Sequence, residues 1–163
     1  MVKIGLLSDT HGHVDAKMLK FFDSVHEIWH AGDIGSIEVV KTLRAQKPVK
    51  AVYGNIDDQG MRMEFPLIQN FTIENVTVFM THIGGYPGNY ASGIKTQLEQ
   101  IKPNLFIAGH SHILKVMFDK KYNCLFMNPG AAGISGFHQV RTMLRFTING
   151  SNISDLEVWE HPR

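Results

Sequence analysis

The sequence has a single cysteine and almost no net charge. Cys124 is the only cysteine, so no intramolecular disulfide can form. It lies in the apolar run 124–127, which predicts a buried thiol in a reducing compartment. The formal net charge is +1, and the sequence contains neither a basic stripe nor a polybasic run. This balance gives no electrostatic basis for binding nucleic acid or a membrane surface, so any anionic ligand must be held locally.

The sequence also lacks a long apolar run. No stretch approaches the ~20 residues of a membrane span, and the chain enters its first strand without a charged-then-apolar leader. We therefore expect a cytoplasmic protein with no membrane partner. The 163 residues predict one domain, 1–163, which buries roughly two thirds of the surface of the unfolded chain. The sequence leaves open whether the chain forms a homo-oligomer.

What the sequence does contain is a repeated local design. Five apolar, β-leaning segments each stop at a side chain of a type that binds metals. These segments are Ile4–Gly12 with Asp9 and His11, Trp29–Asp33, Val52–Asn55, Val78–His82, and Phe106–His112 with His110 and His112. One such ending carries little information, but five indicate a site.

The order of the predicted elements indicates a mixed α/β chain. Helical spacing over 14–22 and 37–43, between strands at 4–8, 27–31 and 49–53, gives a βαβαβ order, which favours a parallel sheet. Residues 59–70 are expected to be irregular, and the loop 84–90, rich in Gly and aromatics, to form a lid or rim. The remaining expected elements are a hairpin of 71–73 with 76–80, a helix ended by Pro103, and strands 105–108, 116–118, 124–127, 142–148 and 153–159, with Asn149-Gly150 as the last turn.

The strand-end residues predict a metal centre. In open α/β sheets ligands bind beyond the carboxyl ends of the strands, so the seven candidate side chains should converge on one rim. Imidazole with carboxylate and no thiolate suits Mn, Fe, Zn, Co or Ni better than Ca or Mg. Seven ligands exceed what one ion with open positions can use, whereas two divalent transition-metal ions sharing a carboxylate use them all.

The same residues carry a resemblance to a known family. Asp9-Thr10-His11, Gly32-Asp33, Gly54-Asn55, His82 and Gly109-His110-Ser111-His112 look like the five ordered motifs of the calcineurin-like metallophosphoesterases. The short chain and its Asn128-Pro129-Gly130 loop are most similar to the small prokaryotic phosphodiesterases of the YfcE type. The resemblance implies an α/β (α+β) fold, a four-layer sandwich of two mixed β-sheets flanked by helices.

The resemblance also implies an activity and a set of roles. Such enzymes hydrolyse phosphodiesters or small phosphate esters with a dinuclear centre, Mn being favoured, that activates water for in-line attack on phosphorus. By resemblance, Asp9, His11 and His112 hold the first ion, Asn55, His82 and His110 hold the second, and Asp33 bridges. Asn55, Asp33 and His82 are thereby the expected catalytic residues, and Asn55 is also expected to contact the substrate phosphate.

Three other positions leave alternatives open. Ile56 stands where many relatives have a histidine thought to protonate the leaving group, and an alkyl side chain cannot do this. His13 either lines the substrate side or caps the following helix, and it is a candidate substrate-binding residue. His138 lies in a late loop, and residue spacing alone does not show whether this loop faces the site.

A second function of a different class is also compatible with the pattern. The resemblance extends to the small retromer subunit of this fold, which works by binding partner proteins. Ile56 weakly favours such a catalytically weak or inactive scaffold. The full set of seven ligands favours the enzyme more strongly, because a scaffold has no need of seven metal-binding side chains on one rim.

Overall fold

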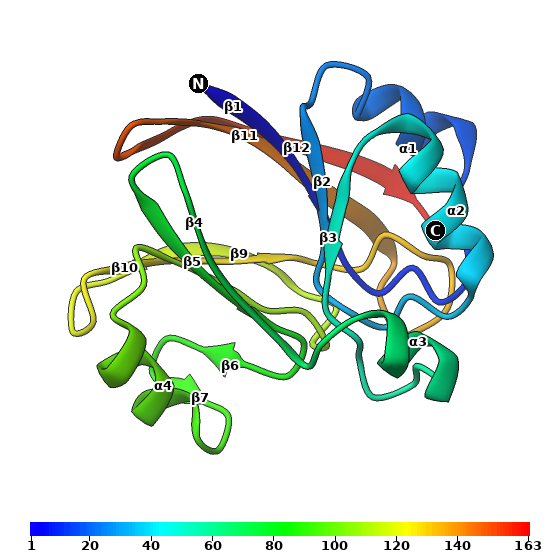
Figure 1. Cartoon of the computed structure of the whole chain (residues 1–163). Coiled ribbons are helices and arrows are strands. Elements are labelled where there is room, and N and C mark those ends of the chain that lie inside the picture. Colours follow the sequence, from blue (N-terminus) through cyan, green and yellow to red (C-terminus); the bar gives the residue numbers. More distant parts are fainter.

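The computed structural model describes residues 1–163 as two five-stranded sheets with helices on their outer faces (Figure 1). The first sheet has the order β12-β11-β1-β2-β3. Its parallel part, β1-β2-β3, confirms the predicted βαβαβ unit, and β11 and β12 form the hairpin predicted at Asn149-Gly150. The bounds are β1 Val2–Leu7, α1 Ala16–Phe21, β2 Glu27–His30, α2 Ile37–Gln46, β3 Val49–Ala51, β11 Val140–Asn149 and β12 Asn152–Pro162.

The second sheet has the order β4-β5-β8-β10-β9. Its three central strands, β5, β8 and β10, run parallel, while β4 and β9 pair antiparallel at the edges. The loop after β5 contains a short hairpin, β6 with β7, before α4. The bounds are β4 Ile68–Ile73, β5 Val76–Thr81, β6 Gly85–Tyr86, β7 Asn89–Tyr90, α4 Ile94–Ile101, β8 Leu105–Ile107, β9 Leu114–Asp119 and β10 Cys124–Pro129.

Alternating side chains on the strands create the four layers. Successive residues of a strand point to opposite faces, so each central strand fills two cores. Ile4 and Leu6 of β1 face Val78 and Met80 of β5 between the sheets. On the outer faces, Leu7 packs in the core under α1 and α2. The outer face of β5, β8 and β10 packs Phe79, Phe106 and Phe126 against α4. The predicted four-layer sandwich is confirmed.

Residues 59–70 depart from the predicted irregular structure. They contain a short helix, α3 (Gln59–Glu64), and the start of β4. Asp58 begins this helix by accepting a hydrogen bond from the backbone N–H of Met61 at 2.9 Å, and the Met61 side chain is buried. Six residues span less than two turns, which is too short for helical periodicity to be visible in a sequence.

None of the four helices is long and apolar enough to cross a membrane.

Candidate metal centre

All seven predicted ligands lie at the carboxyl ends of parallel strands. In the first sheet, Asp9 and His11 follow β1, Asp33 follows β2 and Asn55 follows β3. In the second sheet, His82 follows β5, and His110 and His112 follow β8. Because the two sheets stack with these strand ends at the same edge, the loops of both sheets meet there.

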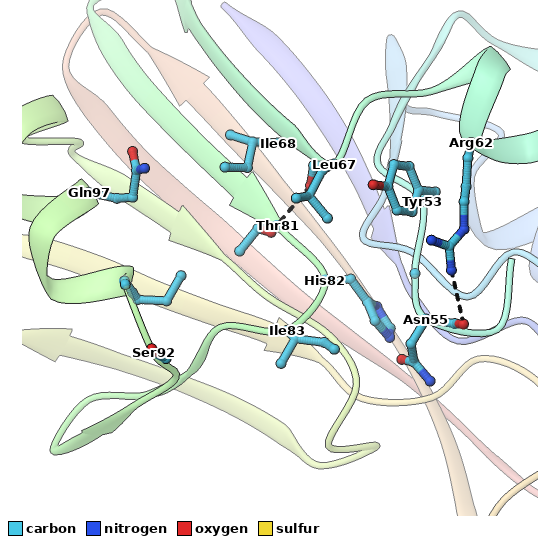
Figure 2. Close-up of a pocket in the computed structure, with 13 residues that line it drawn as sticks. Tyr53, Asn55, Arg62, Leu67, Ile68, Thr81, His82, Ile83, Ser92 and Gln97 are labelled. Atoms are coloured by element: carbon cyan, nitrogen blue, oxygen red, sulfur yellow. Dashed lines mark hydrogen bonds between the residues drawn. The ribbon is translucent and has the colours of Figure 1, made fainter.

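The acidic and imidazole ligands fall into two groups whose ligand atoms lie within 4.8 Å of one another. The first group is Asp9, His11 and His112, and the second is Asp33, His82 and His110. Each group combines residues from both sheets. The first group has the members that the family resemblance implies, and the second contains Asp33, which the resemblance assigns to both ions. Asn55 lies beside the second group, where its side chain neighbours that of His82 (Figure 2).

Asp33 lies between the two groups. Its Oδ2 atom is 3.2 Å from Nε2 of His82 in the second group and 3.5 Å from Nε2 of His11 in the first. Asp9 has a more one-sided position, with Oδ1 3.2 Å from Nε2 of His112 and 3.8 Å from Nε2 of both His11 and His82. One oxygen of Asp33 is therefore positioned to serve both groups, as expected for a bridging carboxylate.

Three of these ligand atoms are buried without a hydrogen-bond partner: Oδ1 of Asp9, Nε2 of His11 and Nε2 of His82. An unpaired buried polar atom costs free energy, so native structures seldom retain one without a reason. Here all three converge on one small volume together with Oδ2 of Asp33. Divalent cations in this volume would satisfy all four atoms, so the residues present fit a metal centre.

Backbone conformation at the site is also unusual. Nine residues other than glycine have positive φ, and five of these are candidate ligands: Asp9, His11, Asp33, His110 and His112. L-residues seldom adopt this left-handed region, which costs of order 1–3 kcal/mol per residue and persists only where the surroundings impose it. The concentration of such residues here indicates that the strand ends are bent to aim side chains at one point.

Close packing of the ligand loops explains one of the motif glycines. A Cβ atom on Gly54 would lie 2.0 Å from Oδ1 and 2.3 Å from the backbone nitrogen of Asp33. A residue other than glycine before Asn55 would therefore displace the carboxylate between the two groups. Oδ1 of Asp33 instead accepts a hydrogen bond from the backbone N–H of Ile56 at 3.1 Å, which leaves Oδ2 facing the imidazoles.

Neighbouring groups fix which atom of each ligand faces the centre. The Ser8 hydroxyl donates to Oδ2 of Asp9 at 2.6 Å, and the backbone N–H of His110 donates to the same atom at 3.1 Å. Nδ1 of His82 lies 2.7 Å from the Ala31 carbonyl, so Nδ1 carries the proton and Nε2 presents its lone pair. Hydrogen bonds of this kind hold metal-binding side chains in one orientation and tautomer.

Two buried side chains tie the ligand loops of the first sheet together. His30 accepts from the N–H of Gly32 at 3.1 Å through Nδ1, and its Nε2 lies 2.9 Å from the Thr10 hydroxyl. Asp57 accepts from the backbone N–H groups of Ile34, Gly35 and Gly54 at 2.8–3.1 Å. The position of His30 within a strand favours a structural role, and its contacts agree with this. For Asp57 the sequence leaves open a contact that orients a ligand or an ordinary turn residue, and in the structure this carboxylate holds the loops that carry Asp33 and Asn55.

Asn128 performs the same task in the second sheet. Its Nδ2 donates to the Gly109 carbonyl at 2.9 Å and to the Ser111 hydroxyl at 3.0 Å, which fixes the loop that carries His110 and His112. The sequence marks Asn128 only as part of a late loop. The sequence analysis assigns no role to Ser8, although a hydroxyl residue directly before Asp9 is a weak local signal.

The charges of the ligands are coupled. Burial opposes ionisation of Asp9, but His11, His112, His82 and the Ser8 hydroxyl outweigh it and hold the pKa of the carboxyl below its ordinary value. Burial also opposes ionisation of Asp33, but the neighbouring His82 imidazole holds the pKa of this carboxyl below its ordinary value. The Asp9 carboxylate raises the pKa of His11. The site thus presents carboxylates to its imidazoles, an environment that attracts cations.

His13 and His138 have different surroundings. Nε2 of His13 lies 3.0 Å from a carboxylate oxygen of Asp15, the residue that caps α1, and His13 lines neither of the two cavities beside the ligands. Nε2 of His138 lies 2.7 Å from the Gly133 carbonyl, and its ring packs edge-on against His112 at 5.1 Å between centroids. His138 therefore lies at the site, and His13 contacts the helix cap.

Two cavities open beside the ligands. One, of about 390 Å³, is lined by His82, Tyr53, Arg62 and the start of α4 (Figure 2). The other, of about 470 Å³, is lined by ligands of both groups, by His138 and by Ile56. Asn55 lines both cavities, so it stands where they meet. The hairpin β6–β7 lies apart from these two cavities, and Tyr86 lines a smaller neighbouring one of about 220 Å³.

A four-layer sandwich with paired carboxylate and imidazole ligands at its strand ends is the architecture of a metallophosphoesterase. The chain matches the model of the calcineurin-like phosphoesterase superfamily domain over residues 2–151 and belongs to this superfamily. The family predicted from the five motifs is thereby confirmed. Members of the family act on phosphate esters with divalent metal ions, and this chain has two candidate groups of ligands for them.

Individual relatives agree with this assignment. The chain is 28% identical over 133 residues to a probable metallophosphoesterase of Methanothermobacter thermautotrophicus, covering 78% of this chain and 76% of that protein. It is 28% identical over 145 residues to a phosphodiesterase of Methanocaldococcus jannaschii, covering 79% and 83%. The crystal structure of Vps29 from Chaetomium thermophilum superposes with a TM-score of 0.77 at 14% identity over 100% of both chains, which shows a shared fold.

Proposed function

We propose that this protein is a phosphodiesterase that holds two divalent transition-metal ions at the edge where its two sheets meet. The observation that carries the proposal is Oδ2 of Asp33, which lies between the two groups, 3.2 Å from Nε2 of His82 and 3.5 Å from Nε2 of His11. Both of these nitrogens are buried without a hydrogen-bond partner. A single ion would leave one of these groups unused. The phosphodiesterase of Methanocaldococcus jannaschii adds support from a relative.

The ligands divide as the two groups suggest. Asp9, His11 and His112 would hold the first ion, and Asn55, His82 and His110 the second, with Asp33 shared. A shell of imidazole and carboxylate suits Mn, Fe, Zn, Co or Ni, and we propose Mn. Ions held there supply Lewis-acid chemistry, which polarises phosphoryl oxygens and lowers the pKa of water.

The protein's own contribution is positioning. The backbone N–H of Ile56 orients the Asp33 carboxylate, and the Ala31 carbonyl orients the His82 ring. The Asn55 side chain has an amide NH₂ that can donate to a phosphoryl oxygen, and it lies at the junction of the two cavities. Catalytic roles for Asn55, Asp33 and His82 follow from these positions, and His13, held by Asp15, is the weaker of the two substrate-contact proposals.

The two cavities favour a diester over a monoester. A phosphoryl group at Asn55 has one cavity on each side, so both ester arms of a diester have room. A monoester would fill only one. At position 56 the side chain is an alkyl group, so it supplies no proton to a departing alkoxide, and we expect activated leaving groups to react best.

A protein-binding scaffold is the second candidate, and the fold shared with Vps29 is the observation in its favour. One of the solved Vps29 structures holds a cyclic peptide. The bent ligand loops and unpaired ligand atoms favour the enzyme, because a surface that binds proteins needs neither. The cytoplasmic location stays a prediction of the sequence.

Metal analysis and hydrolysis together test the proposal. Protein purified without chelator and reconstituted with Mn should bind close to two ions per chain and hydrolyse bis(4-nitrophenyl) phosphate faster than 4-nitrophenyl phosphate. His82→Ala should lose an ion and the activity. His26→Ala, a change of the same kind at an exposed histidine whose Nδ1 accepts from the N–H of Lys3, should keep both. Zero bound ions after reconstitution would remove the enzyme proposal and leave the scaffold.

A further inference from the structure

Three exposed apolar side chains surround the larger cavity. Ile56, Ile113 and Phe137, here called the apolar rim, are 47%, 65% and 103% exposed, and all three line the cavity that contains ligands of both groups. The ligands and His138 supply the polar part of the same cavity. Sites for small molecules usually combine apolar side chains with a few polar groups that converge on one point, and this cavity contains both kinds.

Core packing does not explain these positions. The three residues come from loops that follow β3, β8 and β10, far apart in the sequence, and none belongs to a hydrophobic cluster of the fold. Ile56 directly follows the ligand Asn55, and Ile113 directly follows His112. Exposed apolar side chains that gather around one opening indicate a binding surface, whereas singly scattered ones do not.

The loop that carries Phe137 is held in place. Nε2 of His138 contacts the Gly133 carbonyl at 2.7 Å, and the backbone N–H of Arg163 donates to the Gln139 carbonyl at 3.0 Å. Gly136 lies so close to the ligand ring that a Cβ atom there would be 2.4 Å from Nδ1 of His112. The backbone that carries Phe137 is therefore held beside the ligands, so the loop itself loses little conformational entropy when something packs against the exposed ring.

The charged side chains around the cavity limit the kinds of ligand that it can bind. The cavity is lined by His11, Asp33, Asn55, Ile56, His110, Ser111, His112, Ile113, Gly136, Phe137 and His138, and it has neither lysine nor arginine. No side chain on its walls therefore offers a permanent positive charge to a second phosphate or a carboxylate. The neighbouring cavity does contain a cation, Arg62, whose Nε donates to the Asp57 carbonyl at 2.9 Å. The cavities on the two sides of Asn55 thus differ in charge, because only one of them contains an arginine.

We propose that the apolar rim binds one ester arm of the substrate, so that the protein selects phosphodiesters with an aromatic or branched aliphatic arm over those with hydroxylated or charged arms. The inference rests on the proposed phosphodiesterase function, since the phosphoryl group must lie at Asn55. The aromatic ring of Phe137 offers a face or edge for stacking, worth about tenfold in affinity. Ile56 and Ile113 supply the aliphatic remainder of the contact.

Calorimetry with the Mn-loaded protein tests the rim without catalysis. Phenylphosphonate and methylphosphonate share the phosphoryl group and differ in the arm, and neither is hydrolysed. The wild type should bind phenylphosphonate about tenfold more tightly. Phe137→Ala should abolish most of this preference and leave the affinity for methylphosphonate unchanged. Phe118→Ala, a change of the same kind at a 53% exposed residue of β9 that lines none of the three cavities described above, should retain the preference.

Kinetics provide a second readout. The ratio of kcat/KM for 4-nitrophenyl phenyl phosphate to that for 4-nitrophenyl methyl phosphate should fall about tenfold in Phe137→Ala and stay constant in Phe118→Ala. Equal affinities of the wild type for the two phosphonates would overturn the rim and leave the phosphodiesterase standing. An equal loss of affinity for both phosphonates in Phe137→Ala would also overturn the proposed role of the rim. If neither phosphonate bound the Mn-loaded wild type and neither diester were hydrolysed, the rim and the phosphodiesterase would both be wrong.

Discussion

Replacing His30 by Gln should change how stability depends on pH. His30 is fully buried between the two ligand loops of the first sheet, where Nδ1 accepts from the N–H of Gly32. The Thr10 hydroxyl donates to the Ile34 carbonyl, so it must accept from Nε2–H of His30. Both ring nitrogens are therefore used by the neutral form, and a second proton, on Nδ1, would displace the N–H of Gly32.

Burial lowers the pKa of His30 from 6.5 to about 4, against the opposing pull of the carboxylates of Asp57, Asp9 and Asp33. In the unfolded chain the pKa returns to its ordinary value, so between pH 6.5 and 4 the unfolded state binds more protons than the native state. Stability is thus fully present above pH 6.5 and is lost as the pH falls toward 4. A shift of this size corresponds to about 3 kcal/mol, of which about 2 kcal/mol is lost between pH 7 and 5.

The measurement is urea unfolding of both proteins at pH 7, 6 and 5, with EDTA present to exclude metal binding. His30→Gln should be less stable than the wild type at pH 7, since Gln cannot replace both hydrogen bonds in the same geometry. The gap should then shrink by about 2 kcal/mol toward pH 5, because Gln does not titrate. The other histidines are common to both proteins and cancel in the difference. A gap that stays constant with pH would refute the argument from burial.

Three further changes test separate parts of the site. Asp33→Asn should weaken the binding of both Mn ions in a calorimetric titration, whereas Asp9→Asn should weaken mainly one; a single weakened ion in Asp33→Asn would mean that this carboxylate is not shared. Asp57→Ala should lower the free energy of unfolding by about 3–5 kcal/mol, because three backbone N–H groups lose a charged acceptor. Asp58→Ala, which removes only the cap of α3, should lower the free energy of unfolding by about 1 kcal/mol. Similar losses of stability in the two variants would mean that Asp57 does not hold the ligand loops together. Ile56→His should raise turnover of alkyl diesters by up to ~10² and make the rate less dependent on leaving-group pKa, and an unchanged dependence would show that the new imidazole does not reach the leaving oxygen.

Much of the site could be predicted from the sequence because its signals are local. A ligand type of side chain directly after an apolar strand is visible within a few residues, as at Asp9, Asp33 and His82. The alternation of strands and helical spacing up to Val52 similarly predicts a parallel sheet, and this part of the fold is as predicted. The Asn149-Gly150 turn is equally local and joins β11 to β12.

Tertiary structure decided the features that depend on contacts between distant loops. The sequence could not show that Asp33 lies 3.2 Å from His82, because this distance depends on how the core between the two sheets is packed. It also could not show that Asp33 lies 3.5 Å from His11, because this distance depends on how the loops after β1 and β2 bend. Nor could it show that Ile113 and Phe137 share one cavity with Ile56. Residue type at a strand end is set by local sequence, whereas the distance between two strand ends is set by the side-chain volumes that separate the sheets. Those volumes come from residues throughout the chain.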